Sequence, residues 1–269
     1  MSSVAVILGS AFDAARLANL TLVPETIPTP WGTQVLHRVE HPDRDAYVLF
    51  RHGVPHRLLP HQINYRAQAA ALAAVGCQAL VVTSSVGVLD PRLPLFRLLL
   101  VGDLLMPENR LPDGSTCTMF PHPAPGQGHL VLREGLFATA LADQLRTLAD
   151  RTGVALHPEP VVFAYAGGPR TKTPAENRMW ARLGAQVNSM TVGPEVVLAN
   201  ELGIPCAALV AGHKYSVPDR PAPDDARSVR DSLVAARHAM ERLVVTFLRD
   251  GHPVPFGNHL YRFDASENP

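Results

Sequence analysis

Short polar segments follow most of the apolar runs in this 269-residue chain, and they hold residue types that bind anions and transfer protons. Arg51 and His52 combine a planar cation suited to phosphate with a ring that titrates near neutral pH. Gly9 and Ser10 offer backbone N–H groups and a hydroxyl to an anion, but are equally compatible with a plain tight turn. The six segments are Gly9-Ser10, Arg51-His52-Gly53, Ser84-Ser85, Gly168-Pro-Arg-Thr-Lys172, Met190-Thr191 and Gly212-His-Lys-Tyr-Ser216.

A basic loop continues the second of these segments with His56, Arg57 and His61. The loop is equally compatible with a solvated surface. It is a poor zinc site because no histidine pair has the usual ligand spacing and no carboxylate or cysteine lies nearby, so we expect no metal. The chain also has no G-x-S-x-G nucleophile elbow and no P-loop lysine motif.

The two lysines are unusual, because Lys172 and Lys214 are the only lysines among 24 basic residues. A lysine ammonium is a compact charge with three rotatable donors and differs physically from the planar arginine fork. Both lysines follow predicted strands. We expect at least one to face a ligand, and the alternative is that both point to solvent.

Strands and helices alternate along the chain, and the polar segments lie where predicted strands end. Expected strands cover 4–8, 46–50, 79–83, 96–101, 160–166, 185–188 and 206–211. Expected helices cover 63–75, 134–151, a segment opening with the capping box Thr173-Pro-Ala-Glu176, 194–202 and 228–249. This alternation predicts one α/β domain over residues 1–269, with a mixed, largely parallel twisted sheet flanked by helices. In such sheets ligands bind beyond the carboxyl ends of the strands, so the six segments are expected to converge on one pocket.

The composition excludes several classes of protein. Hydrophobic residues make up 46% and charged residues 18%, with 24 basic and 24 acidic side chains, which is the opposite of a disordered chain. Zero net charge argues against a nucleic-acid partner, and no apolar run approaches the roughly 18 residues of a membrane span. The N-terminus has no basic region typical of a signal peptide. Three widely spaced cysteines without a C-x-x-C pair fit a reduced, cytoplasmic protein.

The order of these motifs resembles the trimeric purine nucleoside phosphorylases, in the branch of the methylthioadenosine and methylthioinosine phosphorylases. The block Arg51-His-Gly-Val-Pro-His-Arg57 with Pro60-His-Gln-Ile-Asn-Tyr-Arg-Ala67 is the most specific part of the resemblance. Further matches are Ile7-Leu-Gly-Ser10, Val81-Val-Thr-Ser-Ser-Val-Gly87, Gly168-Pro-Arg170 with Pro174-Ala-Glu176, and Met190-Thr191 with Pro194-Glu-Val-Val-Leu-Ala199.

The resemblance implies phosphorolysis of a nucleoside to a free base and ribose-1-phosphate, with inorganic phosphate as co-substrate and no organic cofactor or metal. It places Ser10, Arg51, His52, Ser84 and Thr191 around phosphate. Met190 matches the methionine under the ribose, and Ser85 and Val86 continue the substrate wall. The family also implies a homotrimer, in which the 106–129 loop with Phe120 and His122 is a candidate for reaching a neighbouring subunit.

The base-binding half departs from the family pattern. Gly-Pro-x-Phe-Glu-Thr becomes Gly168-Pro-Arg-Thr-Lys-Thr173, so Thr171 replaces the aromatic and Lys172 the carboxylate that reads a 6-oxopurine. Lys214, with His213 before it, stands where Asn or Asp reads the N7 edge, and we expect both to assist the leaving base. The valine and glycine after Thr191 are transposed relative to the usual order.

The 5′ end of the sugar is expected to be apolar. Val229 falls near the position where ordinary purine nucleoside phosphorylases place a histidine, and Leu233 lies one turn further on the same helix face. Both are equally compatible with a place in the core. We therefore expect a phosphorylase of 5′-modified nucleosides with an atypical base pocket. The alternatives are an enzyme of the same fold that acts on a non-purine or anionic-base glycoside, and a catalytically silent binding protein.

Overall fold

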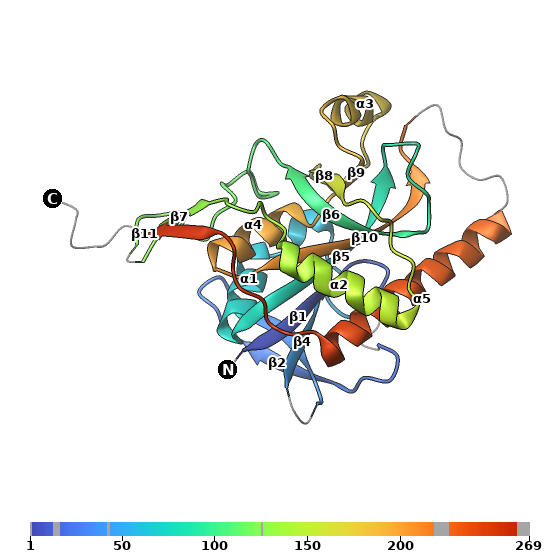
Figure 1. The fold of residues 1–269 in the computed structure, drawn as a ribbon. Coiled ribbons are helices and arrows are strands. Elements are labelled where there is room, and N and C mark those ends of the chain that lie inside the picture. Colours follow the sequence, from blue (N-terminus) through green and yellow to red (C-terminus); the bar gives the residue numbers. More distant parts are fainter. Residues whose placement is uncertain (1, 13–16, 42–43, 125, 218–225, 263–269) are drawn as a thin grey trace.

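A computed structural model describes residues 2–262 apart from 13–16, 42–43, 125 and 218–225, and it leaves the side chains of 226–229 undescribed. The larger sheet has the order β10-β6-β8-β9-β5-β1-β4-β3-β2, and a two-stranded sheet pairs β11 with β7 (Figure 1). The strands are β1 (Ser3–Leu8), β2 (Leu22–Ile27), β3 (Gln34–Val39), β4 (Asp45–Phe50), β5 (Cys77–Val88), β6 (Leu98–Leu105), β7 (Gly128–Val131), β8 (Val161–Tyr165), β9 (Val187–Ser189), β10 (Cys206–Tyr215) and β11 (His259–Arg262).

The sheet is mixed and largely parallel, as the alternation of elements predicted. β1 pairs in parallel with β4 and β5, β5 pairs in parallel with β10, and β8 pairs in parallel with β6 and β9. β5 also pairs antiparallel with β9, so the strands β10, β6, β8, β9 and β5 close into a ring. This closure was not predicted, and it gathers the ends of β5, β9 and β10 around one space.

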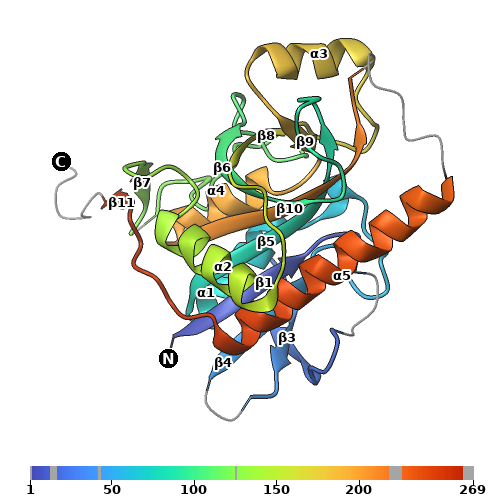
Figure 2. The same cartoon turned by 45° about the vertical axis from the view of Figure 1, so that its right-hand side comes forward.

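Helices cover both faces of the open part of the sheet. They are α1 (Tyr65–Ala74), α2 (Thr139–Thr152), α3 (Pro174–Arg182), α4 (Gly193–Glu201) and α5 (Ala226–Asp250), with a 3-10 turn at Pro60–Gln62. Alternate residues of β1 divide between two cores: Val4, Val6 and Leu8 pack with α2 and α5, while Ala5 and Ile7 pack with α1 and α4. Figure 2 shows α2 and α5 side by side across β1, with α3 standing apart.

Local signals set the helix boundaries. The side chain of Asn64 accepts a hydrogen bond from the Ala67 backbone N–H, so α1 begins two residues later than predicted. The predicted capping box of α3 forms, with Thr173 and Glu176 bonding each other's backbone N–H groups. α2 begins at Thr139, later than the predicted 134, because Gly135 has a φ of 86° and Ala138 is extended.

Candidate active site

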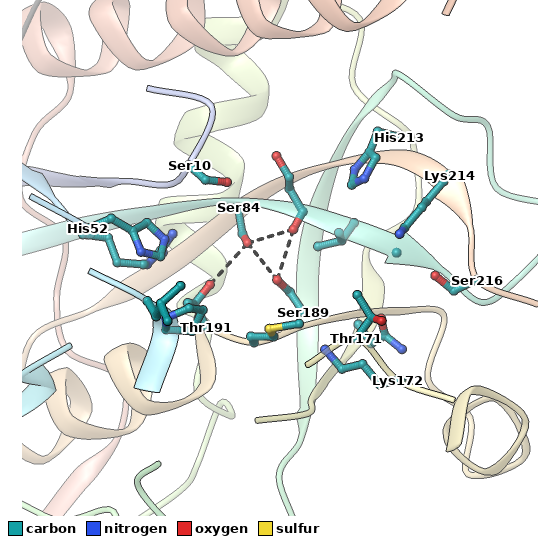
Figure 3. A pocket seen from close by; sticks show the side chains of 18 of the residues that line it. Ser10, His52, Ser84, Thr171, Lys172, Ser189, Thr191, His213, Lys214 and Ser216 are labelled. Carbon is teal, nitrogen blue, oxygen red and sulfur yellow. Dashed lines mark hydrogen bonds between the residues drawn. The ribbon is translucent and has the colours of Figure 1, made fainter. Parts of the chain in front are cut away.

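The predicted strand ends converge on one cavity of about 530 Å³ (Figure 3). It is lined by twelve of the predicted site residues, which are Ser10, Arg51, His52, Ser84, Ser85, Val86, Thr171, Lys172, Met190, Thr191, His213 and Lys214. The other lining residues include Ser189, Asn177, Asn188 and Ser216. The structure therefore brings together residues that lie more than 200 positions apart in the chain.

Arg51 is held at one end of the cavity by a buried carboxylate. Its Nε and Nη2 donate to the two carboxylate oxygens of Glu195 at 2.5 and 2.8 Å, and both side chains are 1% exposed. Nη1 donates to the carbonyl oxygen of Thr83 at 2.8 Å. A guanidinium has five N–H groups, so donors remain for a ligand after these three contacts.

The turn after β1 is shaped around this guanidinium. A Cβ on Gly9 would lie 2.8 Å from Nη1 of Arg51 and 2.9 Å from the Thr83 carbonyl oxygen. The hydroxyl of Thr83 accepts from the Gly9 N–H and donates to the carbonyl oxygen of Ile7, which ties the ends of β1 and β5 together. Glycine is therefore needed here for close approach, and Ser10 follows at the cavity wall.

His52 is a neutral ring at this site. Its Nδ1 lies 2.8 Å from the carbonyl oxygen of Leu58, and because a carbonyl only accepts, Nδ1 carries the proton and Nε2 is left as an acceptor. The ring stacks on His56 at 4.3 Å. Burial, followed by the neighbouring Arg51 charge, lowers the pKa of His52 to about 4.

Four hydroxyl-bearing side chains complete this end of the cavity: Ser84 lies within β5, Ser189 ends β9, and Ser10 and Thr191 follow β1 and β9. The Ser84 Oγ lies 3.3 Å from Ser189 Oγ and 3.4 Å from Thr191 Oγ1. Ser10 lies on the side of Ser84 away from Thr191 (Figure 3). The hydroxyls of Ser84 and Ser189 both donate to the Ser85 carbonyl oxygen at 3.1 Å. Hydroxyls can rotate between donating and accepting, which suits an oxyanion whose protonation changes.

The segment after β9 turns sharply into α4. Val192 has φ 74° and ψ −53°, a conformation that is rare for a β-branched residue. Its N–H donates to the Glu195 carboxylate at 2.8 Å, and its side chain is fully buried. The carboxylate that fixes Arg51 therefore also fixes the turn that presents Thr191, and Met190 lies beside it on the cavity wall.

The opposite end of the cavity holds both lysines. Lys214, on β10, is exposed, and Lys172, on the loop before α3, is half-buried. Burial is the largest of the causes that lower the pKa of Lys172 to about 8, and the charge of Lys214 adds to it. Burial, followed by the Lys214 charge, also lowers the pKa of His213.

Two buried asparagines form the floor of this end. The Asn188 Nδ2 donates to the Asn177 Oδ1 at 2.9 Å, and the side chains are 4% and 7% exposed. The Ser216 hydroxyl lies close above Gly87, where it leaves no room for a side chain. Asn177 and Asn188 were not predicted to line the site, whereas Ser216 ends a polar segment that was expected there.

Two predicted residues are not placed in the cavity. The side chain of Val229 lies outside the described residues. Leu233 is 42% exposed and does not line the cavity of the single chain, so its expected place at the sugar pocket stays a prediction. Leu233 is exposed because α5 packs through Ala236, Met240 and Leu243, whereas its N-terminal turns extend past the sheet (Figure 2).

The buried partners behind the site were missed by sequence reasoning. Glu195 is 144 residues from Arg51, and it was predicted only to lie in a helix and in the segment Pro194-Glu-Val-Val-Leu-Ala199 that resembles the family. A signal existed, because an acid flanked by Pro194 and Val196 in an apolar helix must find a partner when it is buried. Ser189 could have been found as the polar end of β9.

The described residues include no group of three or more His, Cys, Asp or Glu side chains arranged to hold a metal ion. None of the described helices is long and apolar enough to cross a membrane.

Comparison with known proteins agrees with this geometry. The sequence profile of the phosphorylase superfamily matches residues 3–249. A probable 6-oxopurine nucleoside phosphorylase of Moorella thermoacetica is 33% identical over 209 residues, 77% of each chain. A probable S-methyl-5′-thioinosine phosphorylase of Methanopyrus kandleri is 33% identical over 223 residues, 80% of each chain.

A solved structure supports the fold. Methylthioadenosine phosphorylase from Schistosoma mansoni, in complex with tubercidin, superposes with a TM-score of 0.80 over 93% of this chain and 91% of its own, at 21% identity. The profile match and the curated relatives confirm the resemblance drawn from the motifs. The chain therefore belongs to the phosphorylase superfamily, and it is a pentosyltransferase related to the nucleoside phosphorylases.

Proposed function

We propose that the enzyme transfers the pentosyl group of a nucleoside to inorganic phosphate and releases the free base and ribose-1-phosphate. The observation that carries the proposal is the layout of one cavity. Arg51, His52 and four hydroxyls form one end, Met190 lies beside them, and donor side chains form the other end. The names of the relatives, which include 6-oxopurine and methylthioinosine phosphorylases, support the same reaction.

The phosphate end supplies position and polarity. Phosphate held by Arg51, Ser10, Ser84 and Thr191 is placed to attack the anomeric carbon of the ribose. Because Nδ1 of His52 is already used on Leu58, its Nε2 accepts a hydrogen bond from a protonated phosphate oxygen. Such fixed contacts lower the barrier by holding the nucleophile in line and stabilising charge.

The base end supplies donors. As the phosphate oxygen bonds to the anomeric carbon, the glycosidic C–N bond breaks and its electron pair leaves with the base. Lys214 and His213 are positioned to donate to the base as this charge develops. The reaction needs no organic cofactor and no metal, since phosphate is the only co-substrate.

Preference for an apolar 5′ substituent is part of the proposal. It rests on the resemblance, which places Val229, and no histidine, near the 5′ position. Leu233 does not support it, as shown above. Competition between inosine and 5′-methylthioinosine tests it. A tens-fold advantage in kcat/KM for the thioether is expected, since one apolar group contributes about 1–3 kcal/mol.

A homotrimer and a cytoplasmic location complete the proposal. Phe120 packs against a buried cluster of its own chain that includes Ile63 and Met119, so the exposed His122 is the better candidate for reaching a neighbour. A stable monomer at micromolar concentration, measured by light scattering, would contradict the proposed trimer.

The decisive test is a panel of nucleosides incubated with the enzyme, with and without phosphate, followed by measurement of ribose-1-phosphate. Release that depends on phosphate supports the proposal. Base release that is equally fast without phosphate indicates a hydrolase. No release from any nucleoside, with phosphate binding intact, favours the silent binding protein.

A non-purine or anionic-base glycoside is the second candidate substrate, within the same reaction. The observation that favours it is the pair of lysines at the positions where the family reads a purine. The same panel, extended to pyrimidine and acidic-base ribosides, distinguishes it from ordinary purine phosphorolysis.

A further inference from the structure

Charge is unevenly compensated along the cavity. Among the described residues that line it, Arg51, Lys172 and Lys214 are the lysines and arginines, and none is an aspartate or glutamate. The Arg51 charge is balanced by an ion pair with Glu195, which does not itself line the cavity. In the part of the chain that the structure describes, no ion pair compensates either lysine.

Among the described residues, the acid whose charge acts on Lys172 is already engaged. Both carboxylate oxygens of Glu176 accept from Arg170, at 2.7 and 2.8 Å, and one also accepts from the Thr173 N–H at 2.7 Å. Glu176 is therefore locked in an ion pair and a helix cap. Its field reaches Lys172, but its oxygens face other donors.

The side chains of the two lysines lie at the same end of the cavity. Lys214 comes from β10 and Lys172 from the loop on the other side of the cavity, with Ser216 beside them (Figure 3). The Asn177 oxygen is used on Asn188, so its NH₂ group remains to donate. Two ammonium groups in a partly desolvated cavity repel each other, and an anion placed between them removes that repulsion.

We propose that the leaving base of the natural substrate carries a negative charge, in the form of a carboxylate on a purine-like ring, and that Lys172 and Lys214 bind this group. The inference rests on the proposed function, because it assumes that this end of the cavity holds the base. It attributes the choice of base to Lys172 and Lys214, which stand at positions where the family pattern has other residue types.

The test uses an isosteric pair of bases, purine-6-carboxylate and purine-6-carboxamide, titrated calorimetrically into the intact enzyme both without phosphate and with saturating phosphate. The carboxylate is expected to bind at least about tenfold tighter at pH 7, since hydrogen bonds to charged groups contribute about 1.5–3 kcal/mol. Lys172→Met and Lys214→Met should each reduce the preference, and the double variant should abolish it. Arg178→Met is the matched control, because Arg178 is exposed on α3, outside the cavity wall.

The pH dependence of the carboxylate preference is an independent test. Lys172 is faced by Lys214 from β10, by Glu176 from α3 and by Arg170 on its own loop, and its pKa is about 8. The carboxylate preference should therefore persist below about pH 8 and decline above it, while carboxamide binding stays level. This decline should be missing in Lys172→Met.

The outcomes separate the two proposals. Equal affinity for the two bases, or a preference that survives the loss of both lysines, overturns this inference even if phosphate-dependent ribose-1-phosphate release is found. A carboxylate preference that saturating phosphate abolishes shows that the lysines bind a second phosphate, and it also overturns the inference. Carboxylate selectivity without any phosphate-dependent release supports the base site and removes the phosphorolysis proposal.

Discussion

The two ends of the cavity handle positive charge in opposite ways. At the phosphate end, Arg51 is buried and its charge is balanced within the protein by Glu195. At the base end, Lys172 is half-buried, Lys214 is exposed, and no described ion pair balances either charge. The buried pair fixes geometry for a reaction step that is the same for every substrate. The charges of the two lysines remain available to a ligand. The phosphate end therefore serves the reaction, and the base end serves the choice of substrate.

The largest effect is expected from Glu195→Gln. The change leaves the Arg51 charge buried without a partner, which should lower the free energy of unfolding by about 3–5 kcal/mol. Urea denaturation followed by circular dichroism measures this loss. Asp143→Asn, which breaks the solvent-exposed pair with Arg146, is the control and should change stability by less than about 1 kcal/mol. Similar losses in the two variants would show that Arg51 does not depend on Glu195.

A smaller effect is expected from Gly9→Ala. The new methyl group would push on Nη1 of Arg51 and the Thr83 carbonyl, as an overpacked site does, so we expect about 1–3 kcal/mol of destabilisation. The KM for phosphate should rise as well. Gly167→Ala is the control, because a Cβ there would meet no atom closer than 3.7 Å. An unchanged phosphate KM in Gly9→Ala would argue that Arg51 does not contact phosphate.

Lowering the pH should reduce the stability of the fold through His52, at the phosphate end of the cavity. In the unfolded chain this ring takes up a proton near pH 6.5, whereas in the folded protein it does so only near pH 4. Stability is therefore lost as the pH falls from about 6.5 toward 4, by about 2 kcal/mol at pH 5. Urea midpoints at pH 7 and pH 5 should differ less in His52→Gln than in the wild type. His61→Gln, an exposed histidine, should behave as the wild type does.

The smallest change in stability is expected from Glu176→Gln at the base end. The exposed ion pair with Arg170 is lost, whereas a glutamine at this position can still accept from the Thr173 N–H in the capping box. The effect on Lys172 should be clearer, because the Glu176 charge raises its pKa and the unmasked Arg170 charge lowers it. Binding of purine-6-carboxylate should then weaken at a lower pH than in the wild type. An unchanged pH profile would show that Lys172 does not contact the carboxylate.

Local signals in the sequence predicted much of the fold and most of the cavity. The polar segments contain eleven of the twelve predicted residues that line the cavity, the exception being Val86, and the Thr173 capping box located the start of α3. The closure of β5 against β9 and β10 was not predictable in this way, because periodicity within a strand does not encode its partners. The β2–β3 hairpin was missed because Pro24 and Glu25 interrupt its pattern.

Pairings across long sequence separations were also beyond local reasoning. The contact of Glu195, on α4, with Arg51, which follows β4, joins residues that are 144 positions apart, and no spacing rule reports it. The position of Leu233 was beyond local reasoning for a related reason. Its helix face was predicted, but how far α5 extends past the sheet depends on the tertiary structure.

The turn at Val192 and Gly193 restricts which residues can occupy these two positions. A side chain at residue 193 would place a Cβ 2.8 Å from the Tyr165 Cβ and 3.0 Å from the Met106 sulfur, so this position requires glycine. Residue 192 has the opposite requirement, because its side chain is fully buried although its φ of 74° would favour glycine. Exchanging the two residues would therefore put a Cβ where there is no space and leave a void where Val192 packs, so their order decides whether the core closes at this turn.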